Sequence, residues 1–220
     1  QSGSFQPQGG KSCWGSGFLP SRHQGVEIGS IGGTLPYVTS PRGVDRLTRR
    51  RSIDLINKLN RANLDLMRDP EIETRIDAYE LAFRMQESMP ELMNLSSEPE
   101  SIHKLYGIPQ RQGRSFARNC LLARRLVERG ARFVHLFHQG WDTHGVTEKD
   151  DLISGLSKQC RATDRAAAAL IFDLKQRGLL DETLVVWAGE FGRTPMNEER
   201  RGSKLPGRDQ HPRAGTTWLA

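Results

Sequence analysis

The chain has 220 residues, of which 36% are hydrophobic, and a formal net charge of +6. A chain of this length is typical of one domain or a domain and a half. It contains no run of eighteen or more apolar residues, so we expect no transmembrane helix. Its basic residues are spread out except for RLTRRR (46–51), which has no interleaved aromatic residues. This pattern favours a solvated helix face over nucleic-acid binding.

Both ends of the sequence look cut. The first residue is Gln, with no charged and then apolar signal region, and TTWLA (216–220) stops inside an expected strand. We therefore expect an internal piece of a longer protein, whose localisation is not derivable from these residues.

The first half of the chain is predicted to be loop-rich and then helical. Residues 1–43 are rich in Gly, Ser and Pro, with one short strand expected around Pro36–Thr39. Residues 44–130 form the helical segment. Apolar residues at helical spacing predict a helix from Val44 that Pro70 closes, a second that ends before Pro90, and a third that Gly130 stops.

The remaining residues, 131–220, alternate between strand and helix patterns. ARFVHLF (131–137) is predicted to be a strand, and a long helix is expected from about Thr147 to Arg177. TLVVWAG (183–189) is the next strand, with the uninterrupted apolar run of a strand covered on both faces. This order predicts right-handed crossovers in a parallel α/β sheet.

The three cysteines are widely spaced and give neither a disulfide framework nor a CxxC zinc motif. Cys120 and Cys160 occupy apolar helix positions, so buried free thiols are expected there, whereas Cys13 lies in a loop.

A polar cluster follows each predicted strand: HQGWDTHG (138–145) after the first and GEFGRTP (189–195) after the second. A third, PGRDQHP (206–212), precedes residues 216–220. In open α/β sheets, ligands bind beyond the carboxyl ends of the strands. If the three clusters converge at this edge of the sheet, they bring together carboxylates and imidazoles, the groups that binuclear hydrolase sites use. The residues concerned are Asp142, His144, Glu190, Asp209 and His211. Each residue alone also has an ordinary interpretation: a helix cap, a solvated loop side chain, or an ion pair between Glu190 and Arg193.

Four segments carry a family resemblance. GSGFLPSRHQGV (15–26), WDTHG (141–145), TLVVWAGEFGRTP (183–195) and PGRDQHP (206–212) resemble the domain of unknown function 1501, a sulfatase-like family of the alkaline phosphatase superfamily. The resemblance implies an α/β fold with a parallel or mixed sheet sandwiched by helices, here incomplete at both ends. It also implies a single partial domain over residues 1–220.

The resemblance further implies a divalent metal ion (zinc, calcium or magnesium). Its ligands would be Asp142, His144, Glu190 and His211, with Arg193 and Arg208 binding the anionic group of the substrate. One position departs from the pattern, because Gln210 stands where the family usually has His. That departure puts a second metal ion in doubt.

The expected activity is hydrolysis of sulfate or phosphate esters, so the partner is an anionic ester substrate. No Ser, Thr or Cys in this sequence fits the nucleophile pattern of the superfamily, so residues 1–220 are expected to be inactive alone. The alternative is a non-catalytic family member that acts as a binding or surface-associated protein. A periplasmic or extracytoplasmic location is implied by the resemblance only.

Overall fold

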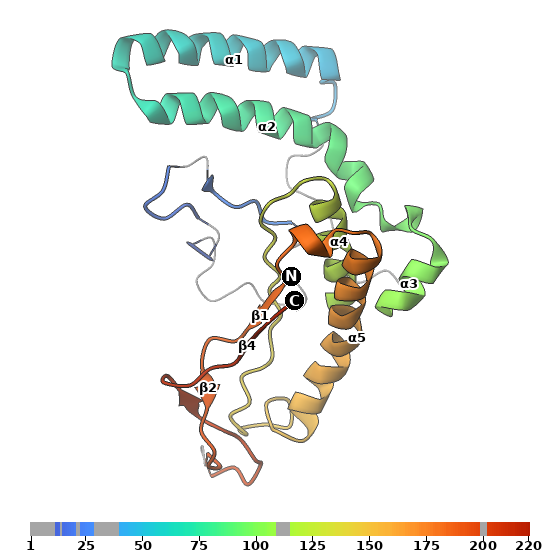
Figure 1. Ribbon diagram of the computed structural model, residues 1–220. Coiled ribbons are helices and arrows are strands. Elements are labelled where there is room, and N and C mark those ends of the chain that lie inside the picture. Colours follow the sequence, from blue (N-terminus) through green and yellow to red (C-terminus); the bar gives the residue numbers. More distant parts are fainter. Residues whose placement is uncertain (1–11, 14, 21–22, 29–39, 109–114, 199–201) are drawn as a thin grey trace. The chain divides into compact units, whose positions relative to one another are not determined.

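The computed structural model describes residues 12–13, 15–20, 23–28, 40–108, 115–198 and 202–220 (Figure 1). The chain divides into two compact units, with the division between Asn94 and Leu95. This division falls inside the stretch 44–130 that was expected to be one helical segment. The short strand expected around Pro36–Thr39 lies outside the described residues.

The first unit contains a helical hairpin formed by α1 (Arg46–Met67) and α2 (Pro70–Met93) (Figure 1). Asp45 begins α1 by accepting a hydrogen bond from the backbone N–H of Thr48, and Asp69 begins α2 in the same way. The predicted basic run faces acids of α2: Arg46 pairs with Glu87 and Arg50 with Glu80, each at 2.6 Å.

The predicted end of the second helix was wrong by one turn. The helix continues through Pro90 to Met93. Inside a helix a proline lacks the backbone donor and its ring crowds the carbonyl four residues back, and only about one further turn follows Pro90. The backbone N–H of Asn94 then closes the helix on the carbonyls of Pro90 and Glu91.

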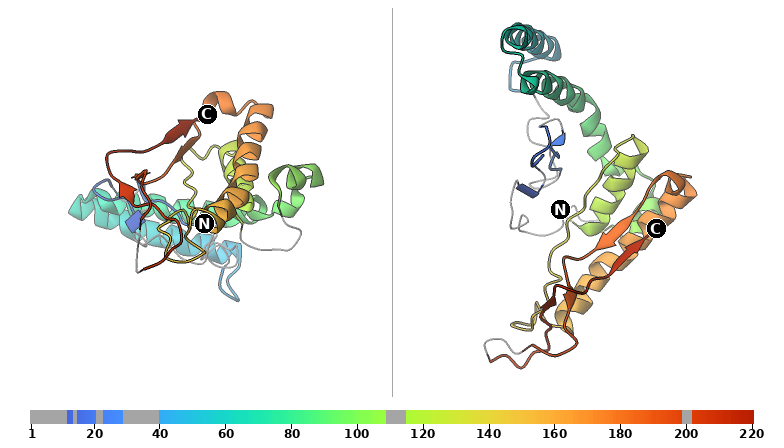
Figure 2. Two further views of the ribbon diagram at one scale, coloured as in Figure 1. Left: turned by 90° about the horizontal axis from the view of Figure 1, so that it is seen from below. Right: turned by 60° about the vertical axis from the view of Figure 1, so that its left-hand side comes forward.

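The second unit is built on three helices, α3 (Glu100–Tyr106), α4 (Phe116–Glu128) and α5 (Ser154–Gln176), with short 3-10 turns η3 (Leu95–Ser97) and η4 (Leu180–Glu182). Helices α4 and α5 pack side by side (Figure 2). Their apolar faces close a core of Leu95, Tyr106, Phe116, Ala117, Cys120, Leu121, Ala166 and Ala169.

The α4–α5 interface also buries a network of charges. The Arg124 side chain is only 2% exposed and lies 2.7 Å from a Glu98 oxygen and 3.0 Å from an Asp173 oxygen. The Tyr106 hydroxyl donates a 3.0 Å hydrogen bond to the same Asp173 oxygen. Arg177 pairs with the second Asp173 oxygen at 2.7 Å. Ionic contacts therefore tie together α4, α5 and the segment that holds Glu98, and the Tyr106 hydrogen bond adds α3.

Cys120 is fully buried, as expected, whereas Cys160 is only partly buried and Cys13 is exposed. Burial raises the pKa of the Cys120 thiol to about 12. Because only the thiolate is nucleophilic, we expect iodoacetamide at pH 8 to alkylate Cys13 at least about 100-fold faster than Cys120. Peptide mass spectrometry of a time course measures both rates. Unfolding in urea should abolish the difference, and comparable rates in the folded chain would contradict the burial of Cys120.

The strands form two small antiparallel sheets in the described part of the chain. Strand β1 (Val186–Ala188) pairs with β4 (Thr217–Leu219), placing Trp187 opposite Trp218. Strand β2 (Gly192–Arg193) pairs with β3 (Gln210–His211). The parallel pairing predicted from the order of elements is absent from these residues. The chain instead turns back after β2, so that β3 runs antiparallel to β2 and β4 antiparallel to β1.

Two predicted elements of this unit also differ in extent. Residues 131–137 form no strand, because no neighbouring strand lies along them in the described structure; a single bridge occurs at His138. Helix α5 begins at Ser154 rather than near Thr147. The Asp151 carboxylate accepts hydrogen bonds from the backbone N–H groups of Ser154 and Gly155, at 2.6 and 2.7 Å, and so fixes the start of the helix.

Trp187 connects the helical core to the segments that hold the candidate site. Its ring packs edge-on against Phe116 of α4 and against Trp141, with centroid distances of 6.0 and 6.1 Å, and stacks on Trp218 at 5.9 Å. Such aromatic contacts fix the position of the WDTHG segment relative to β1. No helix in the described ranges has the length and apolar character needed to span a bilayer.

Candidate metal centre

Three polar segments distant in sequence meet at one end of the second unit. The backbone N–H of Arg208 donates to the carbonyl of Thr143, that of Thr194 to Asp209, and that of Glu198 to Gly207, each at 2.9 Å. These bonds join the segments WDTHG, GEFGRTPMNE (189–198) and PGRDQ (206–210). The convergence expected from the sequence therefore occurs, although through antiparallel backbone pairing.

Glycine is required where two of these segments touch. A Cβ on Gly207 would lie 2.1 Å from the backbone carbonyl carbon of His144. On the other side of the contact, Gly145 has a φ of +73°, and a Cβ there would lie 2.5 Å from the carbonyl oxygen of Leu205. Because glycine has no Cβ, Gly145 and Gly207 together allow the two backbones to approach this closely.

His144 lies at the centre of the junction, 8% exposed. Its Nε2 is 2.8 Å from Oδ1 of Asp142, and its Nδ1 is 2.7 Å from Oε2 of Glu198. A carboxylate only accepts hydrogen bonds, and a neutral imidazole has one N–H. A neutral ring can therefore donate to only one of the two carboxylates, and the other contact needs a further proton or a bound cation between the two groups.

Asp209 completes a group of three ligand atoms with His144 and Glu198. One nitrogen or oxygen from each residue lies within 4.8 Å of the others, and the described residues contain no other such group of His, Cys, Asp or Glu. An imidazole nitrogen with two carboxylate oxygens is a donor set typical of zinc-like divalent ions. The structure thus places His144, but not Asp142, Glu190 or His211, in a three-ligand cluster.

One family of known sequences matches the chain. The family model described as a protein of unknown function (DUF1501) matches residues 1–220. This chain belongs to that family. No curated protein and no solved structure matches it.

In this DUF1501 chain, Arg193 organises the acids that were predicted as ligands. Its guanidinium lies 2.8 Å from Oδ1 of Asp142 and 3.3 Å from Oε1 of Glu190, and donates a 3.3 Å hydrogen bond to the carbonyl of Arg208. The Gln210 amide also donates to Oε1 of Glu190, at 3.4 Å. The ion pair between Glu190 and Arg193, one of the ordinary interpretations of these residues, is present.

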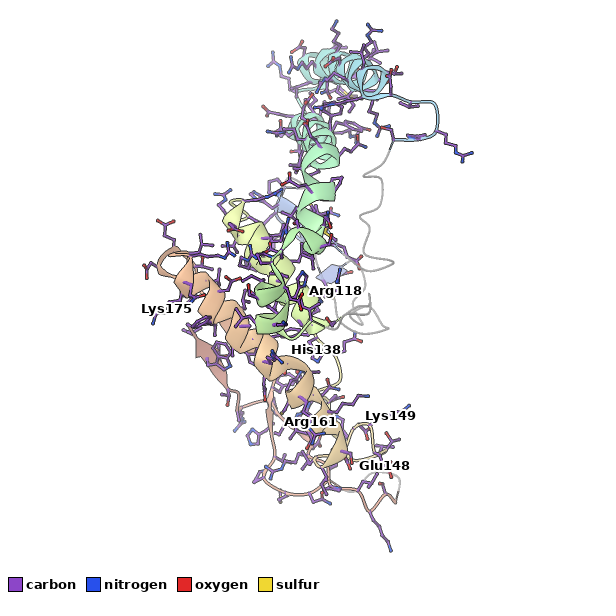
Figure 3. The ribbon with its side chains drawn as sticks, turned by 90° about the vertical axis from the view of Figure 1, so that its right-hand side faces the viewer. Arg118, His138, Glu148, Lys149, Arg161 and Lys175 are labelled. Carbon is purple, nitrogen blue, oxygen red and sulfur yellow. The ribbon has the colours of Figure 1, made fainter. Side chains whose placement is uncertain are left out.

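His211 pairs with Gly192 in the small β2–β3 sheet. Its Nδ1 is buried and has no hydrogen-bond partner among the residues that the structure describes. His138, upstream of WDTHG, lies beside α5 with its Nε2 2.9 Å from the Gln159 amide oxygen (Figure 3). Burial lowers the pKa of His138. Neither histidine belongs to the three-ligand cluster.

Beside the cluster lies a pocket of about 490 Å³, lined by Trp141, Thr143, Leu152, Leu156, Arg193 and Arg208. The Arg208 side chain makes no ion pair with any residue that the structure describes, so its guanidinium is available to an anionic ligand. Both arginines predicted to bind substrate therefore line the same pocket, and within the described part of the chain only Arg193 is paired with acids.

Sequence reasoning missed Glu198. It lies in MNEER (196–200), a charged stretch that reads as a solvated loop. The sequence pointed to Glu198 only by its position shortly after Glu190 and Arg193, beyond the second predicted strand. Asp209 was among the five residues expected to converge, but the family resemblance pointed to His211 instead.

Proposed function

We propose that this chain carries the metal-binding part of a site that hydrolyses sulfate or phosphate esters, with His144, Glu198 and Asp209 holding one divalent ion. The observation that carries the proposal is the pair of carboxylates on the two nitrogens of a buried His144. A cation between Nδ1 and Glu198 would satisfy both contacts with a neutral ring.

The three residues fit such an ion with little movement. Zinc bonds to nitrogen and carboxylate oxygen are about 2.0–2.2 Å long, which places tetrahedral ligands about 3.3 Å apart. The 2.7 Å contact between His144 and Glu198 would thus open by about half an ångström. The exposed Asp209 side chain has room to adjust, and three protein ligands leave a coordination position open.

Asp142 then has a different role from the ligand role predicted for it. With Nδ1 facing the ion, the Nε2–H of His144 donates to the Asp142 carboxylate. A carboxylate in this position fixes the tautomer and orientation of a ligating histidine. Arg193 in turn holds Asp142 in place. We expect Asp142→Asn to weaken metal binding by about 10- to 100-fold without abolishing it.

The substrate side of the proposal rests on Arg208 and the pocket beside it. When bound, the ion would act as a Lewis acid on the ester group. The guanidinium of Arg208 matches the oxygens of a sulfate or phosphate, and the apolar wall of Trp141, Leu152 and Leu156 accommodates an uncharged alcohol part. The sulfatase-like, alkaline phosphatase-like assignment of fold and activity is part of the same proposal and is supported by the motif resemblance.

The test is calorimetric titration of residues 1–220 with Zn²⁺, Mn²⁺, Ca²⁺ and Mg²⁺ in separate experiments. We expect one ion to bind, and His144→Ala and Glu198→Gln to lower the affinity by more than about 100-fold, since each removes a ligand rather than a supporting carboxylate. Glu148→Gln, an exposed acid on a nearby loop (Figure 3), is the matched control and should bind as wild type.

Two outcomes separate the hypotheses. Equal metal affinity in wild type and His144→Ala would overturn the metal centre. Metal binding with no hydrolysis of aryl sulfates or aryl phosphates, by this chain or by a longer chain that contains it, would favour the alternative of a non-catalytic binding protein.

A further inference from the structure

We infer that the site takes a single metal ion because the guanidinium of Arg193 occupies the place of a second one. This inference rests on the proposed function, since it presupposes the ion at His144, Glu198 and Asp209. Asp142 and Glu190 were predicted from the sequence as metal ligands, yet the cation between them is a side chain of the protein itself.

Arg193 is held by three acceptors from different parts of the site: Asp142, Glu190 and the carbonyl of Arg208. Its side chain is 21% exposed, less than either acid that it joins. A guanidinium held on three sides is fixed in position, whereas a single exposed pair would contribute little. The carboxylates of Asp142 and Glu190 are thus paired with a fixed guanidinium in the absence of metal.

Gln210 removes the remaining ligand that a second ion would need. Register places it directly opposite Arg193 in the β2–β3 pair. Its amide N–H donates to the Glu190 oxygen that Arg193 also contacts. An imidazole at this position would offer a nitrogen to a divalent ion, but an amide whose N–H faces Glu190 offers that acid a donor instead.

Charge leads to the same conclusion. Asp142 and Glu190 carry two negative charges, of which Arg193 offsets one. A second dication there would lie against the guanidinium and near the first ion, and like charges this close repel. In two-metal hydrolases the paired ions clamp the reacting group from both sides. Here Arg193 also lines the pocket, so its remaining N–H groups supply the second positive contact to an anionic ester.

The experiment is metal stoichiometry, measured by elemental analysis after equilibrium dialysis against Zn²⁺ and by calorimetry. Wild type is expected to bind one ion. The variant Arg193→Ala/Gln210→His, which frees both acids and adds an imidazole, is expected to bind two. Arg208→Ala is the matched control, because Arg208 lines the same pocket without contacting either acid, and it should still bind one.

The outcomes are separable from those of the proposed function. Wild type that binds no ion refutes the proposed metal centre. Wild type that binds two ions leaves that centre standing and overturns this inference, as does a double variant with wild-type circular dichroism that still binds one. If that double variant does not fold, Arg193→Gln/Gln210→His provides the same comparison with a polar side chain in place of the guanidinium, and an unchanged stoichiometry of one overturns the inference.

Discussion

Gly207→Ala is expected to abolish high-affinity metal binding while leaving the helical core folded. The added methyl group would lie 2.1 and 2.2 Å from the carbonyl carbon and oxygen of His144, both backbone atoms that cannot rotate away. The segment that carries Asp209 must therefore separate from WDTHG. Since the proposed ligands His144 and Asp209 come from the two separated segments, we expect the affinity for Zn²⁺ to fall by more than about 100-fold.

Gly215→Ala is the matched control. A Cβ at Gly215 meets no atom within 4 Å, and its backbone does not require glycine. Calorimetry measures the affinity, and far-ultraviolet circular dichroism checks the helices of both variants. Wild-type affinity in Gly207→Ala would show that the close backbone contact is not needed to assemble the cluster.

Arg124→Met is expected to destabilise the second unit by about 3 kcal/mol. Removing one partner of a buried ionic network leaves the others charged and desolvated, at a cost of about 3–5 kcal/mol. The Asp173 side chain is 2% exposed and the Glu98 side chain 9%, so water can solvate neither charge fully. The lower end of the range applies because Arg177 still pairs with Asp173, and Arg125 with Glu98.

Urea unfolding followed by tryptophan fluorescence measures the change, since Trp141, Trp187 and Trp218 all lie in this unit. Lys104→Ala is the control. Its pair with Glu100 is largely exposed on both sides, so the change should stay below about 0.5 kcal/mol. A loss of less than about 1 kcal/mol in Arg124→Met would mean that the network does not depend on its central arginine.

The helices were largely predictable because their signals are local. Apolar spacing predicted both helices of the hairpin, and Pro70, which was expected to close the first, begins the second. The start of α5 was misjudged because Asp151, rather than the residues near Thr147, supplies the capping oxygen. Strands were less predictable, because a strand exists only where a second segment pairs with it.

The candidate site was predictable as a region but not residue by residue. WDTHG and GEFGRTP indicated which segments would meet, and the family match over residues 1–220 agrees with the resemblance in those segments. In the structure Asp209, and not His211, lies in the cluster with His144, and Asp142 and Glu190 pair with Arg193. Asp209 and His211 are two positions apart, so in an extended chain they lie on the same face but about 6.6 Å apart along it. Which of the two reaches His144 therefore depends on where the segment lies along WDTHG, and its own sequence does not encode that position.

The sequence by itself determined the family, the helices and the polar residue types from which a metal centre can be made, because each is encoded in short stretches of the chain. Only the tertiary structure decided that Glu198 joins His144 and that Arg193 lies between two acids. Those contacts span 54 and 51 residues of sequence. Gly145 and Gly207 let the backbones of the WDTHG and PGRDQ segments approach closely. This approach depends on the meeting of two distant segments, and the residue pattern within either segment does not reveal it.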